Sequence, residues 1–483
     1  MHRYRAALVC LSLSLLLVGC DKDPTSALAS YALQACPTGP LNVNAPITLT
    51  FTGPTASASV AAGNVVVSDA ATGIELPGAL RLNNTSTGST IDFTPTAALP
   101  FSTHLRIRLQ NLLRLETNTP IEVTVCDVLT APPPITQLFW SRLPDVTGDR
   151  LVGASLFSAD SGYVISAAVP VYRRQGNEWV PVFDQPYFYR GEDVSFVSPT
   201  HGFTGHYDSR ISKGFVLETM TGTAYDTIAS SPAFESITRL YMVPGSDGAV
   251  QFGVAGGGGG LGARLYKYDV PSDRFASVAF FNPTAQIADI DFTSGDTADG
   301  VAVSTGFGLV GSPVAPGRVL VTADGGARWS EVPNAAASQA VAYYGTARQA
   351  NGNIWVAGGN GTLLHLVPDG SGAYTVNQVS LPGLTNPDTT NYQSLILTDV
   401  EFAPGNDQVG WVVGAQIFTQ NRISNYRGII YGTSDGGATW TRQGVQGAPD
   451  FGASIPRLNR IDALSATSVW IVGDGGIVLS YKP

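Results

Sequence analysis

Apolar and polar residues alternate in short runs along most of the chain after its first forty residues. Runs of this kind, bounded by Gly, Asn, Ser or Pro, are typical of β-strands with one buried face. The first group comprises Pro46–Thr52, Asn64–Ser68, Thr90–Thr94, His104–Leu109 and Ile121–Val125. Several short strands at this spacing predict a β-sandwich. Since no long amphipathic helical pattern follows the first twenty residues, we expect an all-β protein.

A second pattern repeats from about residue 138 to the end of the chain. Each unit has an apolar strand, a turn, and a second strand that opens with a small or aromatic residue. The second strands are marked by Gly162-Tyr163, Gly202-Phe203, Gln251-Phe252, Gly300-Val301, Ile354-Trp355, Gly410-Trp411 and Val469-Trp470. A further aromatic residue marks the outer strand of six units, at Trp179, Tyr225, Phe275, Trp329, Tyr374 and Trp440.

The seventh outer strand is missing at the C-terminal end, where the chain stops after Ile477–Pro483. Trp140, in the strand Leu138–Leu143 that precedes the first unit, supplies the missing aromatic residue. We therefore predict that this strand completes the last sheet and closes a seven-bladed β-propeller. Residues 140–483 then provide about 49 residues for each four-stranded blade. Six or eight blades remain alternatives if the glycine-rich stretch Gly256–Gly262 disguises a unit.

Two units carry a recognisable turn, TSDGGATW at Thr433–Trp440 and TADGGARW at Thr322–Trp329. Each follows a β-branched run, so the Asp-Gly-Gly lies where a hairpin reverses. Glycine supplies positive φ, and the aspartate can accept backbone N–H groups within the turn. We expect a structural role for six residues in these turns: Asp324, Gly326, Trp329, Asp435, Gly437 and Trp440.

The N-terminus carries a targeting signal. Arg3 and Arg5 precede an apolar run too short to span a bilayer, which ends Leu-Val-Gly-Cys at Cys20. This ending resembles the lipobox of bacterial lipoproteins, in which the cysteine is lipidated and becomes the first residue. The resemblance implies a lipoprotein signal peptide over residues 1–19 and lipidation of Cys20; an ordinary secretory signal is the alternative.

Cysteine usage agrees with export. If Cys10 leaves with the signal and Cys20 carries lipid, only Cys36 and Cys126 remain, and we expect them to form a disulfide outside the reducing cytosol. The expected layout is a tether over residues 20–35, a β-sandwich over 36–127, a Pro-rich linker over 128–137 and the propeller over 138–483.

Charge narrows the functional classes. The 483-residue chain has a net charge of −10 and only 13% charged residues. Nucleic-acid binding needs a basic surface, so this composition argues against it. We expect no cofactor and no metal. The pair His201 and His206 near Asp208, and Asp296 with Asp299, are more typical of strand and turn residues than of metal ligands. Gly256–Gly260 lacks the Lys-Ser/Thr ending of a phosphate-binding loop, and we interpret it as a hairpin tip.

Both predicted domains resemble known families. The runs PITLTFTGP and IDFTPTAALPFSTHLRIRL resemble the SbsA-type bacterial Ig-like domain, which implies a spacer or adhesion module without an active site. IWVAGGNGTLLH at Ile354–His365, VGWVVG at Val409–Gly414 and the TSDGGATW turn resemble photosystem II assembly and stability factor propellers, within the wider BNR or Asp-box group. That resemblance implies a protein-binding platform, not an enzyme.

Sialidases also contain Asp-boxes, and Ser141-Arg142-Leu143-Pro144 is close to their opening motif. Sialidases hold that arginine on an inner strand, whereas our assignment places Arg142 on an outer strand, far from the axis. Other glycosidases need two carboxylates at a fixed separation, which acids scattered among loops do not reveal.

A ligand is expected on the face that carries the outer-to-inner and second-to-third strand connections. Its longer loops include Asp184–Gly191, Ser380–Ser394, Gln416–Arg427 and Gly444–Arg457. Tyr and Arg are the side chains most often found as interface anchors. The candidate ligand-binding residues are Tyr189, Arg190, Tyr392, Arg422, Tyr426, Arg427 and Arg457.

The sequence thus leads us to expect a lipid-anchored cell-envelope protein, facing the periplasm or the cell exterior, with a non-catalytic propeller that binds a protein or glycan. A carbohydrate-active hydrolase that uses the same face is the alternative, and a surface-layer or adhesion component without a discrete ligand is a third.

Overall fold

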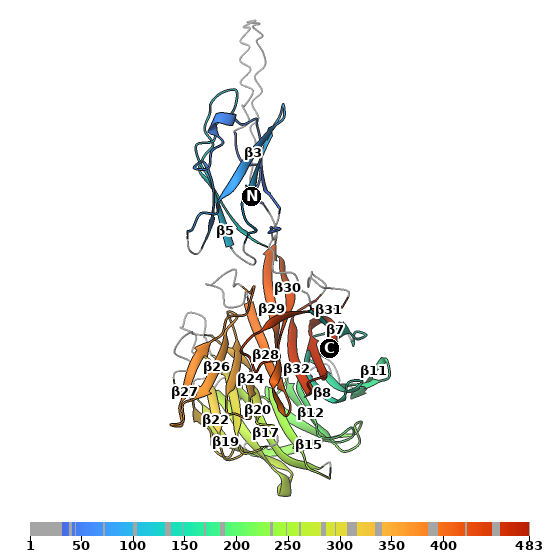
Figure 1. The fold of residues 1–483 in the computed structure, drawn as a ribbon. Coiled ribbons are helices and arrows are strands. Elements are labelled where there is room, and N and C mark those ends of the chain that lie inside the picture. Colours follow the sequence, from blue (N-terminus) through green and yellow to red (C-terminus); the bar gives the residue numbers. More distant parts are fainter. Residues whose placement is uncertain are drawn as a thin grey trace, which may run out of the picture. The chain divides into compact units, whose positions relative to one another are not determined.

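The computed structural model describes residues 31–482 except 38–40, 44, 71–72, 100–103, 131–136, 147, 169–170, 184–188, 232–234, 248, 260–261, 282–285, 295, 307–315, 334–340, 385–394, 421–422 and 447–454. These residues fold into two compact units, the first ending at Thr130 (Figure 1). Cys20 and the predicted signal peptide lie outside the described residues. None of the helices in the described part of the chain has the length and apolarity needed to cross a bilayer.

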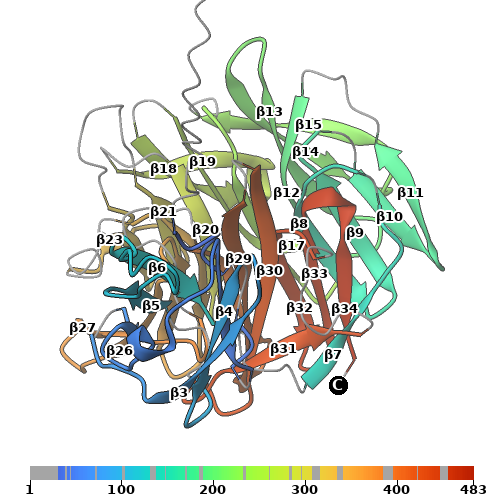
Figure 2. The same cartoon turned by 90° about the horizontal axis from the view of Figure 1, so that it is seen from above.

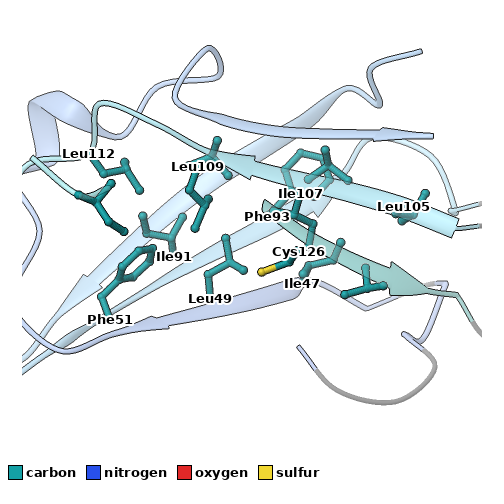
Figure 3. Close-up of a cluster of buried hydrophobic side chains, with 14 of the residues drawn as sticks. Ile47, Leu49, Phe51, Ile91, Phe93, Leu105, Ile107, Leu109, Leu112 and Cys126 are labelled. Carbon is teal, nitrogen blue, oxygen red and sulfur yellow. The ribbon is translucent and has the colours of Figure 1, made fainter. Parts of the chain in front are cut away.

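The first unit consists of two three-stranded antiparallel sheets. One has the order β1-β4-β3 and the other β2-β5-β6. Their bounds are β1 (Ile47–Phe51), β2 (Val65–Asp69), β3 (Gly78–Asn84), β4 (Ser89–Pro95), β5 (His104–Leu109) and β6 (Thr124–Leu129), with a short 3-10 helix η1 (Ser57–Ser59). Alternate side chains of the two sheets, such as Leu49 and Ile107, point toward one another and form one buried core (Figure 3).

The disulfide between Cys36 and Cys126 is present, as predicted, and joins two segments 90 residues apart in sequence. The predicted bounds of the tether differ from the structure, because Tyr31 is buried in the core of the first unit. Its ring stacks on Phe51 and its hydroxyl forms a 2.6 Å hydrogen bond with Thr55. Strand β6 also continues to Leu129, beyond the expected end of the sandwich at residue 127.

The second unit contains seven four-stranded antiparallel blades among its described residues. The first four blades are β8 (Leu151–Ser158), β9 (Ser161–Ser166), β10 (Val171–Gln175), β11 (Glu178–Phe183); β12 (Tyr189–Phe196), β13 (Gly202–Asp208), β14 (Lys213–Thr219), β15 (Tyr225–Ser231); β16 (Arg239–Pro244), β17 (Val250–Gly259), β18 (Gly262–Asp269), β19 (Arg274–Phe281); and β20 (Gln286–Phe292), β21 (Gly300–Thr305), β22 (Val319–Thr322), β23 (Ser330–Glu331). The last three are β24 (Tyr343–Arg348), β25 (Ile354–Gly358), β26 (Leu363–Pro368), β27 (Tyr374–Gln378); β28 (Leu395–Ala403), β29 (Asn406–Gln420), β30 (Ile423–Thr433), β31 (Thr441–Val445); and β32 (Leu458–Ser465), β33 (Ser468–Gly473), β34 (Val478–Tyr481), β7 (Gln137–Arg142). Short 3-10 helices η2 (Val270–Ser272) and η3 (Asp474–Gly476) lie between strands.

The blades form a closed ring. Each innermost strand contacts the innermost strand of the next blade, from β8 through β12, β16, β20, β24 and β28 to β32, and β32 contacts β8. Seen from above, the blades follow one another around a common centre in the order of the sequence colours (Figure 2). The predicted all-β propeller is thus confirmed. The core between neighbouring blades is built from the marked second-strand residues, including the fully buried Trp355, Trp411 and Trp470.

Strand β7 closes the ring from the N-terminal side. It pairs antiparallel with β34, with Trp140 opposite Tyr481, and it also pairs with β31 of the preceding blade. The Trp140 side chain is fully buried, and its indole N–H donates to Gln443 Oε1 at 2.9 Å. Arg142 ends this outermost strand and forms an exposed ion pair with Asp145. Arg142 is therefore remote from the axis, where a sialidase-type arginine would be needed.

The two Asp-Gly-Gly turns join the third strand of a blade to its outer strand. Asp435 Oδ1 accepts the backbone N–H of Thr439 at 2.8 Å, while Thr433 Oγ1 accepts that of Gly437 at 2.9 Å. Asp324 and Thr322 make the same pair of bonds, to Arg328 and Gly326. The bond from the Arg328 N–H lowers the pKa of Asp324. Thr439, through its side chain and its backbone, lowers the pKa of Asp435.

The glycines of these turns have positive φ, at +88° for Gly437 and +75° for Gly326. A Cβ atom on Gly437 would lie 2.2 Å from Trp355, and one on Gly326 would lie 3.0 Å from Val254. The turns therefore pack directly onto a side chain of the neighbouring blade, and Trp440 and Trp329 cover them.

Two loop predictions were wrong. Gly256–Gly259 is not a hairpin tip, because it continues strand β17 and pairs with β18. Glycine is required there by close packing, since a Cβ on Gly257 would lie 1.9 Å from the carbonyl oxygen of Ser236. Most of Gln416–Arg427 is also strand: β29 and β30 remain paired out to Gln420 and Ile423, so this segment is a long β-hairpin.

Candidate functional site

A cavity of about 180 Å³ lies at the end of the ring where the innermost strands begin. This end carries the connections from each outer strand to the next inner strand. The cavity is lined by Arg150, Val152, Glu192, Thr238, Arg239, Gln286, Ala288, Thr305, Tyr344, Thr398, Arg457 and Asn459. We call it the channel-mouth cavity. All seven blades contribute to it, so it exists only because the ring is closed.

β-bulges direct side chains into the channel-mouth cavity. In six innermost strands the pairing with the second strand skips one residue: Val152, Glu192, Ala288, Tyr344, Thr398 and Asn459. A bulged residue leaves the normal alternation of the strand, which re-aims its side chain. All six skipped residues line the cavity. In the remaining blade Thr238, just before β16, provides the corresponding side chain.

Three of these cavity residues also hold neighbouring blades together. The hydroxyl of Thr398 donates to the carbonyl of Leu458 at 2.7 Å, and the amide of Asn459 donates to the carbonyl of Leu151 at 2.8 Å. Thr238 makes the equivalent bond to the carbonyl of Ile287. These donors are therefore already engaged in the fold.

The residues that follow the lining positions along the inner strands form a ring that includes three buried carboxylates. The residue after each bulged position is Gly153, Asp193, Asp289, Gly345, Asp399 or Arg460, and Arg239 follows Thr238. The three aspartates of this ring each accept a backbone N–H from the innermost strand of the next blade at 2.8 Å. The pairs are Asp193 with Leu240, Asp289 with Thr346, and Asp399 with Ile461. A Cβ on Gly345 would lie 2.7 Å from the carboxylate of Asp399, so glycine leaves room for the neighbouring acid.

A second tier of acceptors lies two residues further along the strands. Asp291 accepts the N–H of Arg348 at 2.7 Å, and Glu401 accepts that of Ala463 at 3.0 Å. Asp462 bonds the N–H of Leu156 at 2.5 Å and thereby joins the last blade to the first. Because an inner strand has its second edge unpaired, these acids satisfy backbone groups that would otherwise be buried without partners.

Burial governs the protonation of these groups. It raises the pKa of Asp291, Asp399 and Asp462 to about 7, and it raises the pKa of Glu401 well above its ordinary value. Arg460 lies between the acids and pairs with Asp289 and, at 3.2 Å, with Asp399. Burial works against its charge, but the two carboxylates hold the pKa of Arg460 above its ordinary value.

The rim of the cavity is cationic. Arg150, Arg239 and Arg457 line it together with one acid, Glu192. Burial lowers the pKa of Arg457 and of Arg239. Glu192 pairs with Arg190 at 2.5 Å, but burial raises its pKa. Within the described part of the chain, no ion pair joins Arg150 or Arg457 to an acid.

The structure brings one of the seven predicted ligand residues into the lining of this cavity, Arg457. Arg190, at the start of β12, pairs with the lining residue Glu192 but does not itself line the cavity. Tyr189 packs instead against Phe215, with ring centroids 4.9 Å apart. Tyr426 is exposed on the long hairpin, next to Arg427.

The other two predicted ligand residues, Tyr392 and Arg422, lie outside the described residues. The histidines considered as metal ligands have other partners: His201 with Glu218 and His206 with Thr204, both at 2.8 Å. Burial lowers the pKa of His206 to about 3, which keeps it neutral. Among the described residues, no three His, Cys, Asp or Glu side chains are grouped so that they could hold a metal ion.

Sequence reasoning missed the ring of charged residues around the axis. The signal was a charged residue that interrupts an apolar inner strand once in several successive blades, at Asp193, Arg239, Asp289, Asp399 and Arg460. Isolated charges within apolar runs are rarely buried without partners. Their recurrence at the blade period could have indicated a shared location at the axis.

No protein-family model matches the chain, and no curated protein matches it in sequence. Solved propellers match it in structure. YCF48 bound to D1 peptide is 16% identical, with a TM-score of 0.51, and the match covers 73% of this chain and 100% of that one. A GH74 xyloglucanase from Xanthomonas campestris is 17% identical, with a TM-score of 0.52, over 71% of this chain and 53% of that one. At these identities the similarity establishes that the second unit of this chain has the β-propeller fold.

Proposed function

We propose that this protein is a lipid-anchored component of a bacterial cell envelope and that its propeller binds a protein or glycan without catalysing a reaction. The observation that carries the proposal is the channel-mouth cavity, where cationic side chains converge from different blades while the nearby acids are engaged elsewhere. A site built from several blades is rigid, because every lining strand is held by the ring.

The chemistry of the acids favours binding over hydrolysis. Glycoside hydrolysis needs two carboxyl groups placed on either side of the scissile bond. Among the described residues that line the cavity, Glu192 is the single acid. Asp193, Asp289 and Asp399 follow lining positions along the inner strands and accept N–H groups from neighbouring blades, so their oxygens are committed to holding the ring together.

Hydrolysis remains the second candidate, since one observation favours it. Carboxyl groups with a pKa near 7 are suited to general acid catalysis, and burial places Asp291, Asp399 and Asp462 in that range. Turnover of a polysaccharide panel, abolished by Asp399→Asn in a folded protein, would replace our proposal with this one.

The envelope location rests on the lipobox-like ending at Cys20 and on the disulfide between Cys36 and Cys126, which is typical of an oxidising compartment. In this proposal the first unit is an SbsA-type Ig-like spacer between the anchor and the propeller. Metabolic labelling with an alkyne fatty acid tests the anchor directly. We expect a labelled, detergent-extracted protein whose label is lost in Cys20→Ser, while labelling of that variant would contradict the anchor.

Affinity capture from detergent-solubilised envelopes tests the binding function. We expect the native chain to retain a partner in stoichiometric amount and Arg150→Glu/Arg457→Glu to lose it. Arg328→Glu is the matched control, because Arg328 is exposed in an Asp-Gly-Gly turn, outside the cavity lining. Equal retention by all three proteins would show that the cavity is not the binding site.

A further inference from the structure

Two arginines that line the channel-mouth cavity each carry one buried N–H group without a hydrogen-bond partner in the described part of the chain. Arg239 Nε and Arg457 Nε are both buried and have no hydrogen-bond partner among the described residues. An unsatisfied buried charged donor is destabilising, so such groups in a native protein call for an explanation. Both arginines line the same cavity, although they come from different blades. One bound anion could therefore satisfy both.

Among the described residues, acids lie near Arg239 but none accepts a hydrogen bond from either Nε. Asp289 Oδ1 forms an ion pair with Arg239 Nε at 3.6 Å, beyond hydrogen-bond distance, and it also pairs with Arg460. Glu192 pairs with Arg190. The described part of the lining carries three arginines and one acid, and this excess of positive charge favours a ligand that carries a negative charge.

The other lining residues favour a ligand that is larger than a bare oxyanion. The cavity has a volume of about 180 Å³, which gives room for more than a single water molecule. The lining also includes neutral polar groups and one aromatic ring, from Gln286, Thr305 and Tyr344. A ligand that carries a carboxylate and several hydroxyl groups would match these lining side chains.

We propose that the channel-mouth cavity binds a single acidic sugar residue, a hexuronate, with its carboxylate on Arg239 and Arg457 and its hydroxyls toward Gln286 and Thr305. This inference rests on the proposed binding function and specifies the class of ligand. Guanidinium groups suit a carboxylate because two parallel N–H donors match its two oxygens. Glu192 opposes the ligand, since its negative charge lies on the same rim.

Isothermal titration calorimetry on the full chain tests the proposal with D-glucuronate and D-galacturonate as probes, and with D-glucose, acetate and inorganic phosphate as comparisons. We expect a uronate to bind at least tenfold more tightly than each of the other three. Arg457→Gln should weaken uronate binding at least tenfold, and Glu192→Gln should strengthen it severalfold. Arg328→Gln is the matched control and should leave the affinity unchanged.

Arg457 makes no ion pair with a described acid, so Arg457→Gln should fold, and its circular dichroism and melting temperature would verify this. Gln286→Ala gives a second, uncharged probe and should weaken uronate binding without changing acetate binding. Glucose that binds as tightly as the uronates, phosphate or acetate that does so, or an Arg457→Gln protein with native affinity would each overturn the proposal.

The outcome separates this inference from the broader function. If envelope capture yields a partner that is lost in Arg150→Glu/Arg457→Glu, yet no uronate binds, the binding platform stands and the acidic-sugar assignment is wrong. If a uronate binds in calorimetry while capture yields no partner, the ligand class stands and the envelope-partner function is wrong.

Discussion

Replacing Trp140 with alanine should open the propeller at its closure. Trp140 belongs to β7, the only strand of the last blade that comes from the N-terminal side of the second unit. Its side chain is fully buried, its ring centroid is 4.9 Å from that of Tyr481, and its N–H donates to Gln443. The side chain thus connects the start of the propeller with its last strand and with the blade before it.

The expected loss of stability follows from these contacts. Removing a buried tryptophan ring costs about 3–5 kcal/mol through lost burial and the cavity left behind. Gln443 is buried, and its unpaired oxygen adds about 1 kcal/mol or more. We therefore expect Trp140→Ala to lower the free energy of unfolding by about 4–6 kcal/mol. Trp140→Phe keeps a ring and removes only the N–H, so it should lose about 1–3 kcal/mol.

Guanidinium unfolding followed by tryptophan fluorescence measures this, because all seven tryptophans lie in the second unit. Trp329→Ala is the matched control, since the indole N–H of Trp329 bonds only to Gly326 within its own turn. Hydrogen exchange should accelerate first in β33 and β34 for Trp140→Ala, and in β22 and β23 for Trp329→Ala. A loss below about 1 kcal/mol, or equal acceleration in all blades, would refute the closure argument.

Three further predictions concern the turn, the axis and the first unit. Gly437→Ala should lower the melting temperature more than Gly436→Ala, because only at Gly437 would the new Cβ overlap Trp355; equal losses would contradict this. Asp462→Asn keeps an acceptor but removes a carboxyl whose pKa is raised to about 7, and this raised pKa makes the stability of the native protein fall as pH rises from about 4 to 7. The melting temperature of the variant relative to that of the native protein should therefore be higher at pH 8 than at pH 5. A pH-independent difference would refute the assignment. Cys36→Ser opens a 90-residue loop and should destabilise the first unit by about 4–5 kcal/mol, measured by exchange of the β5 amides, with unchanged exchange as the contrary result.

Local signals in the sequence predicted the strands and their order within each blade. The aromatic residues that open the second strands fall on the predicted elements, because apolar alternation and turn residues act over a few positions. Those that mark the outer strands also do so, except Trp329 and Trp440, which lie one residue before β23 and β31. Even the closure by Trp140 was predictable, since one outer strand was missing at the C-terminus and one was in excess at the start.

Local signals failed where the backbone is irregular or where blades meet. The glycine run at Gly256–Gly259 suggests a flexible tip, but close contact with Ser236 makes it part of a strand. No particular residue type in the sequence marks the bulges that direct Glu192 and Tyr344 into the cavity. Of the predicted ligand residues, Arg457 lines the cavity, whereas Tyr189 packs against a neighbouring ring.

The sequence alone thus determined the repeating strands, the all-β class and the cysteine pair, since each depends on neighbours along the chain or on a simple count. Only the tertiary structure decided the channel-mouth cavity and the role of the buried acids. Asp193, Asp289 and Asp399 are separated by a blade or more in sequence, and they meet only when the ring closes. Closure turns these buried acids into inter-blade acceptors, and it brings arginines from different blades to the lining of one cavity.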